Sequence, residues 1–161
     1  MKYMRLSRFL AALLVSLLMG SFALADNLDK LREKLKGEND PVDRAKATAK
    51  LGDELIKQMG DCYKAGANTD AEQLLEEYLK AVRAAHRGLQ ESGRDARRKP
   101  AGFKQLEIHL RKSARDMERI AQHAPADSRE ALVQAQNELS AIRSELLQAL
   151  MQGNSKPKSD I

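Results

Sequence analysis

Apolar residues recur at steps of three and four along most of this chain, the spacing that places side chains on one face of an α-helix. The repeat stops near residues 37–40, 66–70, 92–102 and 125–128, where Gly, Pro, Asn or Asp residues gather. The pattern therefore predicts helices over about 28–36, 41–65, 70–91, 102–124 and 128–152. We expect an all-α fold, either an antiparallel four-helix bundle or two stacked helical hairpins, with a short extra N-terminal helix.

Residues at the predicted helix ends support these boundaries. Asp40 precedes Pro41, so a carboxylate suited to capping free amides is followed by the residue best suited to the first helical position. Gly66 follows the last apolar position of the same helix, where a left-handed residue commonly ends the helix. Asp127 and Glu130 have capping-box spacing, which predicts that the last helix begins beside them.

The first 25 residues differ from the rest of the chain. Three basic residues within 1–8 precede an apolar run over 9–19, and Ala-Leu-Ala follows at 23–25. This order of basic, apolar and small residues is the pattern of a secretory signal peptide. The apolar run is shorter than the roughly 20 residues that a membrane-spanning helix needs, which argues against a retained membrane anchor. We expect cleavage after Ala25, a periplasmic or secreted location in a bacterial host, and no transmembrane segment after cleavage. The rest of the chain is expected to form one helical domain over 26–153, followed by a disordered tail over 154–161.

Removing the leader changes the charge balance. The whole chain has 28 basic and 23 acidic residues, three of the basic ones lie in the leader, and residues 83–119 alone hold eleven basic and five acidic residues. We expect this segment to attract an anionic partner near the 94–99 loop, although a solvated loop that only aids solubility is the alternative. The candidate partner-binding residues are Arg87, Arg94, Arg97, Arg98, Lys99, Lys104 and Arg111.

Candidate chemistry is sparse. None of His86, His109 and His123 has another histidine at the spacing that would place two imidazoles on one metal ion, and we expect all three at the boundary or surface. The lone Cys62 lies on an apolar stripe, which favours a core position over a reactive or partner-linking thiol. We therefore predict no catalytic residue, cofactor or metal.

Around the first turn, Cys62-Tyr63-Lys64-Ala65-Gly66 is followed by Ala71, Leu75 and Tyr78. This run, within about residues 55–80, resembles the middle of a tetratricopeptide repeat, in which Gly ends the first helix and a small residue lets the second pack closely. The first helix is longer than in that family, and no second copy follows at a period of about 34 residues. The resemblance implies a similar helical hairpin and, less directly, peptide binding.

These observations lead to one functional expectation. The chain is expected to be an exported, non-catalytic helical interaction module that binds a protein, or an anionic polymer or lipid of the cell envelope, through a bundle face or the basic loop. Nucleic acid is not expected, because no aromatic residues interleave with the basic ones. A small-ligand or metal carrier with its site in the bundle core, or an enzyme with a dispersed site, are the alternatives.

Overall fold

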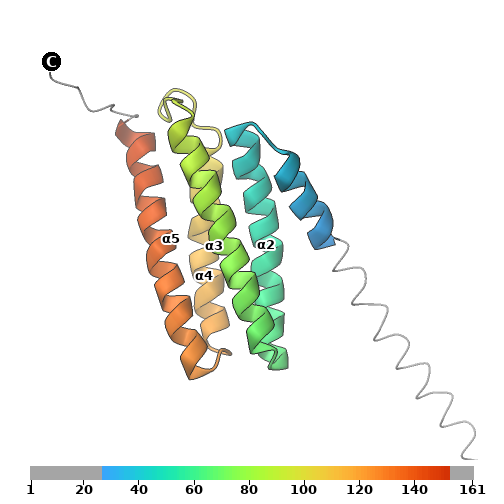
Figure 1. Cartoon of the computed structure of the whole chain (residues 1–161). Coiled ribbons are helices and arrows are strands. Elements are labelled where there is room, and N and C mark those ends of the chain that lie inside the picture. The colour runs from blue at the N-terminus through green and yellow to red at the C-terminus, as the bar shows by residue number, and fades with distance from the viewer. Residues whose placement is uncertain (1–26, 153–161) are drawn as a thin grey trace, which may run out of the picture.

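The computed structural model describes residues 27–152, so the predicted signal peptide over 1–25 and the predicted tail over 154–161 lie outside the described residues. All regular structure in the described range is helical, which confirms the predicted all-α fold (Figure 1). A helical segment over 27–37 precedes the four long helices. These are α2 (Pro41–Ala65), α3 (Asn68–Glu91), α4 (Phe103–Ala121) and α5 (Ala126–Gln152).

The ends of α2 follow the sequence prediction. The Asp40 carboxylate accepts hydrogen bonds from the backbone N–H groups of Val42, at 2.8 Å, and Asp43, at 3.2 Å. At the other end Gly66 adopts a left-handed φ of 76°, and the next N–H, that of Ala67, donates to the Cys62 carbonyl at 2.9 Å. This conformation turns the chain directly into α3.

The turn between α4 and α5 differs from the prediction. The helix α4 ends at Ala121 rather than near 124, because the N–H groups of both His123 and Ala124 donate to the Ile120 carbonyl and tighten the last turn. The helix α5 begins at Ala126, since the Pro125 carbonyl accepts from the Arg129 N–H at 3.1 Å. Asp127 therefore lies inside the first turn, and the predicted capping box is wrong.

The four long helices form two hairpins, α2–α3 and α4–α5, that pack side by side. Residues that contact each other across α3 and α5 lie 55 or 56 positions apart in sequence toward both ends of the pair, as in the Glu72–Ser128 and Gln90–Glu145 contacts. This constant separation means that the two helices run in the same direction. Helices that run in the same direction lie diagonally in an antiparallel four-helix bundle, whereas here α2 packs on α4 and α3 contacts α5, so stacked hairpins describe the packing better.

The helix α2 packs between α3, α4 and the 27–37 segment. The core side of α2 contacts α3 and α4, and the 27–37 segment lies beside α2 as well. That segment is attached through buried Leu28 and through Arg32, whose guanidinium donates to both carboxylate oxygens of Glu77 on α3 at 2.7 Å. The helix α4 packs mainly on α2 and α5, which leaves its remaining side exposed.

The 92–102 connection is only partly the exposed loop that the sequence predicts. Ala96 is fully buried, and Gly102 has a φ of 85° at the start of α4. A side chain at Gly102 would meet Leu89 at 2.8 Å and the Val42 backbone at 3.1 Å, so this glycine allows the loop to close over the end of the core. The charged residues of the loop are thereby held in place at the N-terminal end of α4.

Candidate functional site

The exposed side of α4 carries a line of basic side chains. Lys104, Ile108, Arg111 and Arg115 follow one another at steps of four, three and four residues, so they share one face of the helix. All four are exposed, and Ile108, in the middle of the line, has 44% of its surface accessible. We call these four residues the basic face.

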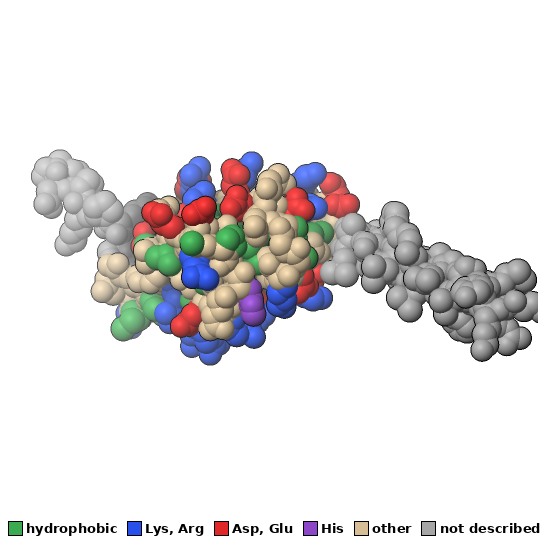
Figure 2. Space-filling view, turned by 90° about the horizontal axis from the view of Figure 1, so that it is seen from below, with side chains coloured by type: hydrophobic (Ala, Val, Ile, Leu, Met, Phe, Trp, Pro, Cys, Tyr) green, Lys and Arg blue, Asp and Glu red, His purple; other side chains and the backbone are tan. Residues whose placement is uncertain are grey.

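The positive charge of the basic face is not balanced locally. Within residues 27–152, none of its three cations forms an ion pair, whereas the α4 acids Glu107 and Asp116 are each engaged by an arginine. The exposed Glu118 lies three residues after Arg115 on the same side of the helix, so three cations face a single carboxylate. Figure 2 shows Lys and Arg side chains gathered along the lower edge of the molecule, where α4 lies, while opposite charges alternate along the upper edge.

Two loop residues extend the basic face. Arg97 and Lys99 are exposed and lie just before α4, whereas Arg98 lies 3.6 Å from Asp95. The basic face thus contains two of the predicted candidates, Lys104 and Arg111, and two more, Arg97 and Lys99, precede its N-terminal end along the chain. Arg115 was missing from the predicted set, although its position four residues after Arg111 on a predicted helix is a signal that identifies it.

Two further candidates do not join this surface. The half-buried Arg94 guanidinium donates to the Asp40 carboxylate at 2.7 Å, so it ties the loop to the start of α2. Arg87 lies on α3, the helix diagonal to α4. Its exposed side chain is therefore separated from the basic face by the rest of the packing.

The side of α5 that adjoins the basic face is mostly uncharged in its middle part. Gln136 donates to the α4 carbonyl of Ala114 at 3.2 Å, which identifies the edge of α5 that faces α4. Val133, which is 49% exposed, together with Ser140 and Ser144 lies on the solvent side of that edge by helical spacing. The basic face of α4 and this side of α5 form a continuous outer surface of the second hairpin.

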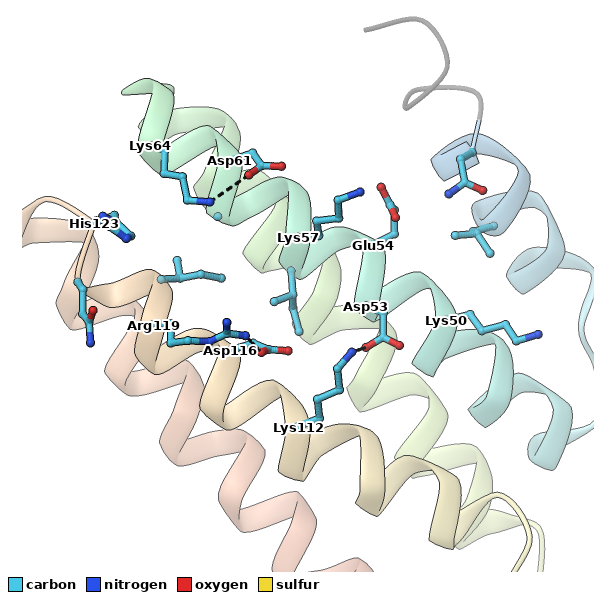
Figure 3. Close-up of a pocket in the computed structure, with 16 residues that line it drawn as sticks. Lys50, Asp53, Glu54, Lys57, Asp61, Lys64, Lys112, Asp116, Arg119 and His123 are labelled. Atoms are coloured by element: carbon cyan, nitrogen blue, oxygen red, sulfur yellow. Dashed lines mark hydrogen bonds and ion pairs between the residues drawn. The ribbon is translucent and has the colours of Figure 1, made fainter. Parts of the chain in front are cut away.

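A separate groove lies over α2, between the 27–37 segment and α4 (Figure 3). Its volume is about 860 Å³, and charges of both signs line it. Many of these charges neutralise one another, as in the pairing of the Lys112 ammonium with Asp53 at 2.8 Å and of Lys64 with Asp61 at 3.3 Å. This internal pairing makes the groove a weaker attractor for anions than the basic face.

A cluster of buried polar side chains lies beneath the wall of the groove. The apolar spacing of the sequence did not predict polar groups at this place in the core. The Tyr78 hydroxyl donates to Ser113 Oγ at 2.8 Å and lies 3.1 Å from His109 Nε2, while His109 Nδ1 lies 3.4 Å from the Asp53 carboxylate. Gly52 leaves space for the two rings, because a side chain there would meet His109 at 2.6 Å. Burial raises the pKa of Tyr78, and the hydrogen bond from His109 lowers the pKa of Asp53 to about 2.

The buried cluster has the members of a catalytic Asp–His–hydroxyl arrangement but not its accessibility. Tyr78 and Ser113 are each only 1% exposed, so neither hydroxyl can reach a substrate in the groove. The prediction that His109 lies at the boundary or surface is wrong, since it is 5% exposed. His86 is also buried, at 9%, and burial lowers its pKa; His123 is exposed at the groove, as predicted.

Other candidate chemistry adds little. Cys62 is half-buried against the core, and burial raises the pKa of its thiol, which keeps the thiol protonated. No three His, Cys, Asp or Glu side chains between residues 27 and 152 come together in a way that would hold a metal ion. None of the helices in that range combines the length and apolar character that a membrane crossing requires.

Comparisons with known proteins leave the site to be interpreted from its own geometry. No protein-family model, curated protein or solved structure matches this chain.

Proposed function

We propose that the protein is an exported, non-catalytic helical module that binds an anionic component of the cell envelope through the basic face of α4. The observation that carries the proposal is the line of Lys104, Arg111 and Arg115, all exposed and without an ion pair among the described residues. Arg97 and Lys99 add positive charge at one end of that line. Uncompensated cations on one surface attract polyanions over roughly 10 Å at moderate salt.

Inorganic polyphosphate provides a defined probe for this function. The test variant replaces Lys104, Arg111 and Arg115 with Gln, and the matched control replaces Lys50, Lys57 and Lys80, three exposed lysines outside the basic face. Both variants lose the same net charge, so only the location differs.

Binding is measured by calorimetry over a range of salt concentrations. We expect the test variant to bind more weakly and the slope of log K against log salt to fall by about one unit for each lost contact. The control should retain most of the wild-type affinity. Equal binding by the two variants, with both folded by circular dichroism, would remove the basic face from the function.

A polar small-ligand carrier is a second candidate, with its site at the surface instead of in the bundle core. The groove of about 860 Å³ favours it, because that volume suits a small molecule. Native mass spectrometry of protein purified from its own compartment tests this candidate. A stoichiometric co-purified ligand that is lost on Lys57→Glu substitution supports the groove as the binding site. A ligand retained by this variant places the site elsewhere.

A further inference from the structure

We propose that the anionic partner is a phospholipid membrane, on which the protein lies with α4 and the adjoining side of α5 against the lipid headgroups. The inference rests on the proposed function and adds the identity of the partner to it. It follows from the shape of the surface, the position of its apolar residues and the excess of cations over carboxylates on it.

The basic face has the shape of a surface contact rather than a pocket. From Lys104 to Arg115 the line is roughly 16 Å long at the α-helical rise per residue. It runs along the convex side of a helix, so its cations cannot converge on one small anion. They are spaced to contact several headgroups of a flat anionic layer at once.

The apolar residues on this surface distinguish a membrane from a soluble polyanion. Ile108 lies among the cations of the basic face, and Val133 lies on the adjoining side of α5; they are 44% and 49% exposed. Together with Met151, they are the large apolar side chains that stand exposed in the described range, and all belong to the second hairpin. A soluble polyanion gains nothing from them, whereas the headgroup region of a bilayer accepts apolar side chains beside lysine and arginine.

The neighbouring surface also suits an anionic membrane. The side of α5 beside the basic face presents Val133, Ser140 and Ser144, and the exposed Arg129 and Glu130 before them offset each other in charge. Lys112 and Arg119, at the groove edge of α4, are already held by Asp53 and Asp116. The unpaired cations of α4 therefore lie on the outer surface of the second hairpin and not at the groove.

Vesicle sedimentation tests the proposal with the protein that begins at Asp26. This form omits the apolar 9–19 run, which would itself bind lipid, and retains the whole described core from Leu28 to Leu146. We expect binding to vesicles of phosphatidylcholine with phosphatidylglycerol, none to phosphatidylcholine alone, and weakening by salt. Replacing Lys104, Arg111 and Arg115 with Gln should lower the affinity about fivefold per residue, or about a hundredfold in all.

The matched variant with Gln at Lys50, Lys57 and Lys80 should retain most of its affinity for the anionic vesicles. A basic-face variant that binds these vesicles as tightly as the control would overturn the proposal. Both variants are checked for folding by circular dichroism, so that a loss of binding reports the surface and not the fold.

A fluorescent reporter tests the orientation independently. The chain contains no Trp, so Ile108→Trp introduces a single fluorophore on the basic face, and Lys80→Trp provides a control on α3. With anionic vesicles we expect a blue shift of the emission at position 108 and none at position 80. No shift at 108, or equal shifts at both positions, contradicts the orientation.

The vesicle and polyphosphate experiments separate the two proposals. Binding to polyphosphate without binding to anionic vesicles overturns the membrane inference, leaves the proposed function standing and assigns the basic face to a soluble polyanion or acidic protein. Failure to bind either probe overturns both. Binding to phosphatidylcholine alone also overturns the inference, because the contact would then not depend on lipid charge.

Discussion

The close approach of α2 to the rings of His109 and Tyr78 makes Gly52→Ala the most direct test of the core. An added methyl group at Gly52 would lie 2.6 Å from His109 Nε2 and 2.7 Å from a Tyr78 ring carbon. Such atoms normally pack at about 3.5 Å or more, so both rings must move away. Their movement also disturbs the hydrogen bond between Tyr78 and Ser113.

Opposing terms determine the size of this effect. Overpacking costs about 1–3 kcal/mol and a weakened hydrogen bond about 1 kcal/mol, while alanine is favoured over glycine within a helix by about 1 kcal/mol. We therefore expect the free energy of unfolding to fall by about 1–3 kcal/mol, or a Tm lower by about 3–10 °C for a domain of this size.

Urea and thermal unfolding followed by circular dichroism measure the change in stability. Gly88→Ala on α3 is the matched control, because a methyl group added there would meet no other atom within 4 Å. It should raise the free energy of unfolding by up to about 1 kcal/mol. If Gly52→Ala is as stable as the wild type or as Gly88→Ala, the rings do not pack against α2 as described.

Three further experiments test individual polar contacts, two in the buried cluster and one at the start of α2. Tyr78→Phe should lower the free energy of unfolding by about 1–2 kcal/mol in urea, since it removes buried hydrogen bonds without creating a cavity; an unchanged midpoint argues against the cluster. The lowered pKa of Asp53, about 2, contributes stability that is complete above its ordinary value near 4 and lost as the pH falls toward 2. Because the Asp53 side chain is 49% exposed, we expect less than about 1 kcal/mol from this effect, and Asp53→Asn should make the urea midpoint less dependent on pH between these values. Asp40→Ala should lower the urea midpoint more than Arg94→Ala, because only the first removes a helix cap; the opposite order contradicts the capping role.

The helices could be predicted from the sequence because their signals are local. The apolar steps within each helix, the Asp40 cap and the Gly66 end are all determined by residues a few positions apart. The capping-box prediction failed for a reason that is also local. The Pro125 carbonyl accepts the first helical hydrogen bond, so the helix begins before Asp127 can cap it.

The buried cluster could not be predicted in the same way, because its members come from three helices. Asp53 on α2, Tyr78 on α3 and His109 on α4 meet only when the register between the two hairpins is known. A partial signal did exist. Gly52 lies in the middle of a long apolar stripe where no turn requires a glycine, which is typical of a close approach by another element.

Stacking of the hairpins leaves a wider uncovered arc on α4 than on α2. The helix α2 has α3 and α4 against its core side and the 27–37 segment beside it, so residues on a wide arc, Ala47 and Thr48 among them, are buried. The helix α4 packs mainly on two neighbours and buries a narrower arc, and the basic face lies on the side that neither neighbour covers. A third helix packed there would bury Lys104, Arg111 and Arg115 without carboxylates to pair with them, at a large desolvation cost. The charges on α4 therefore oppose extension of the stack by a further hairpin, and they leave this face free to meet an anionic surface.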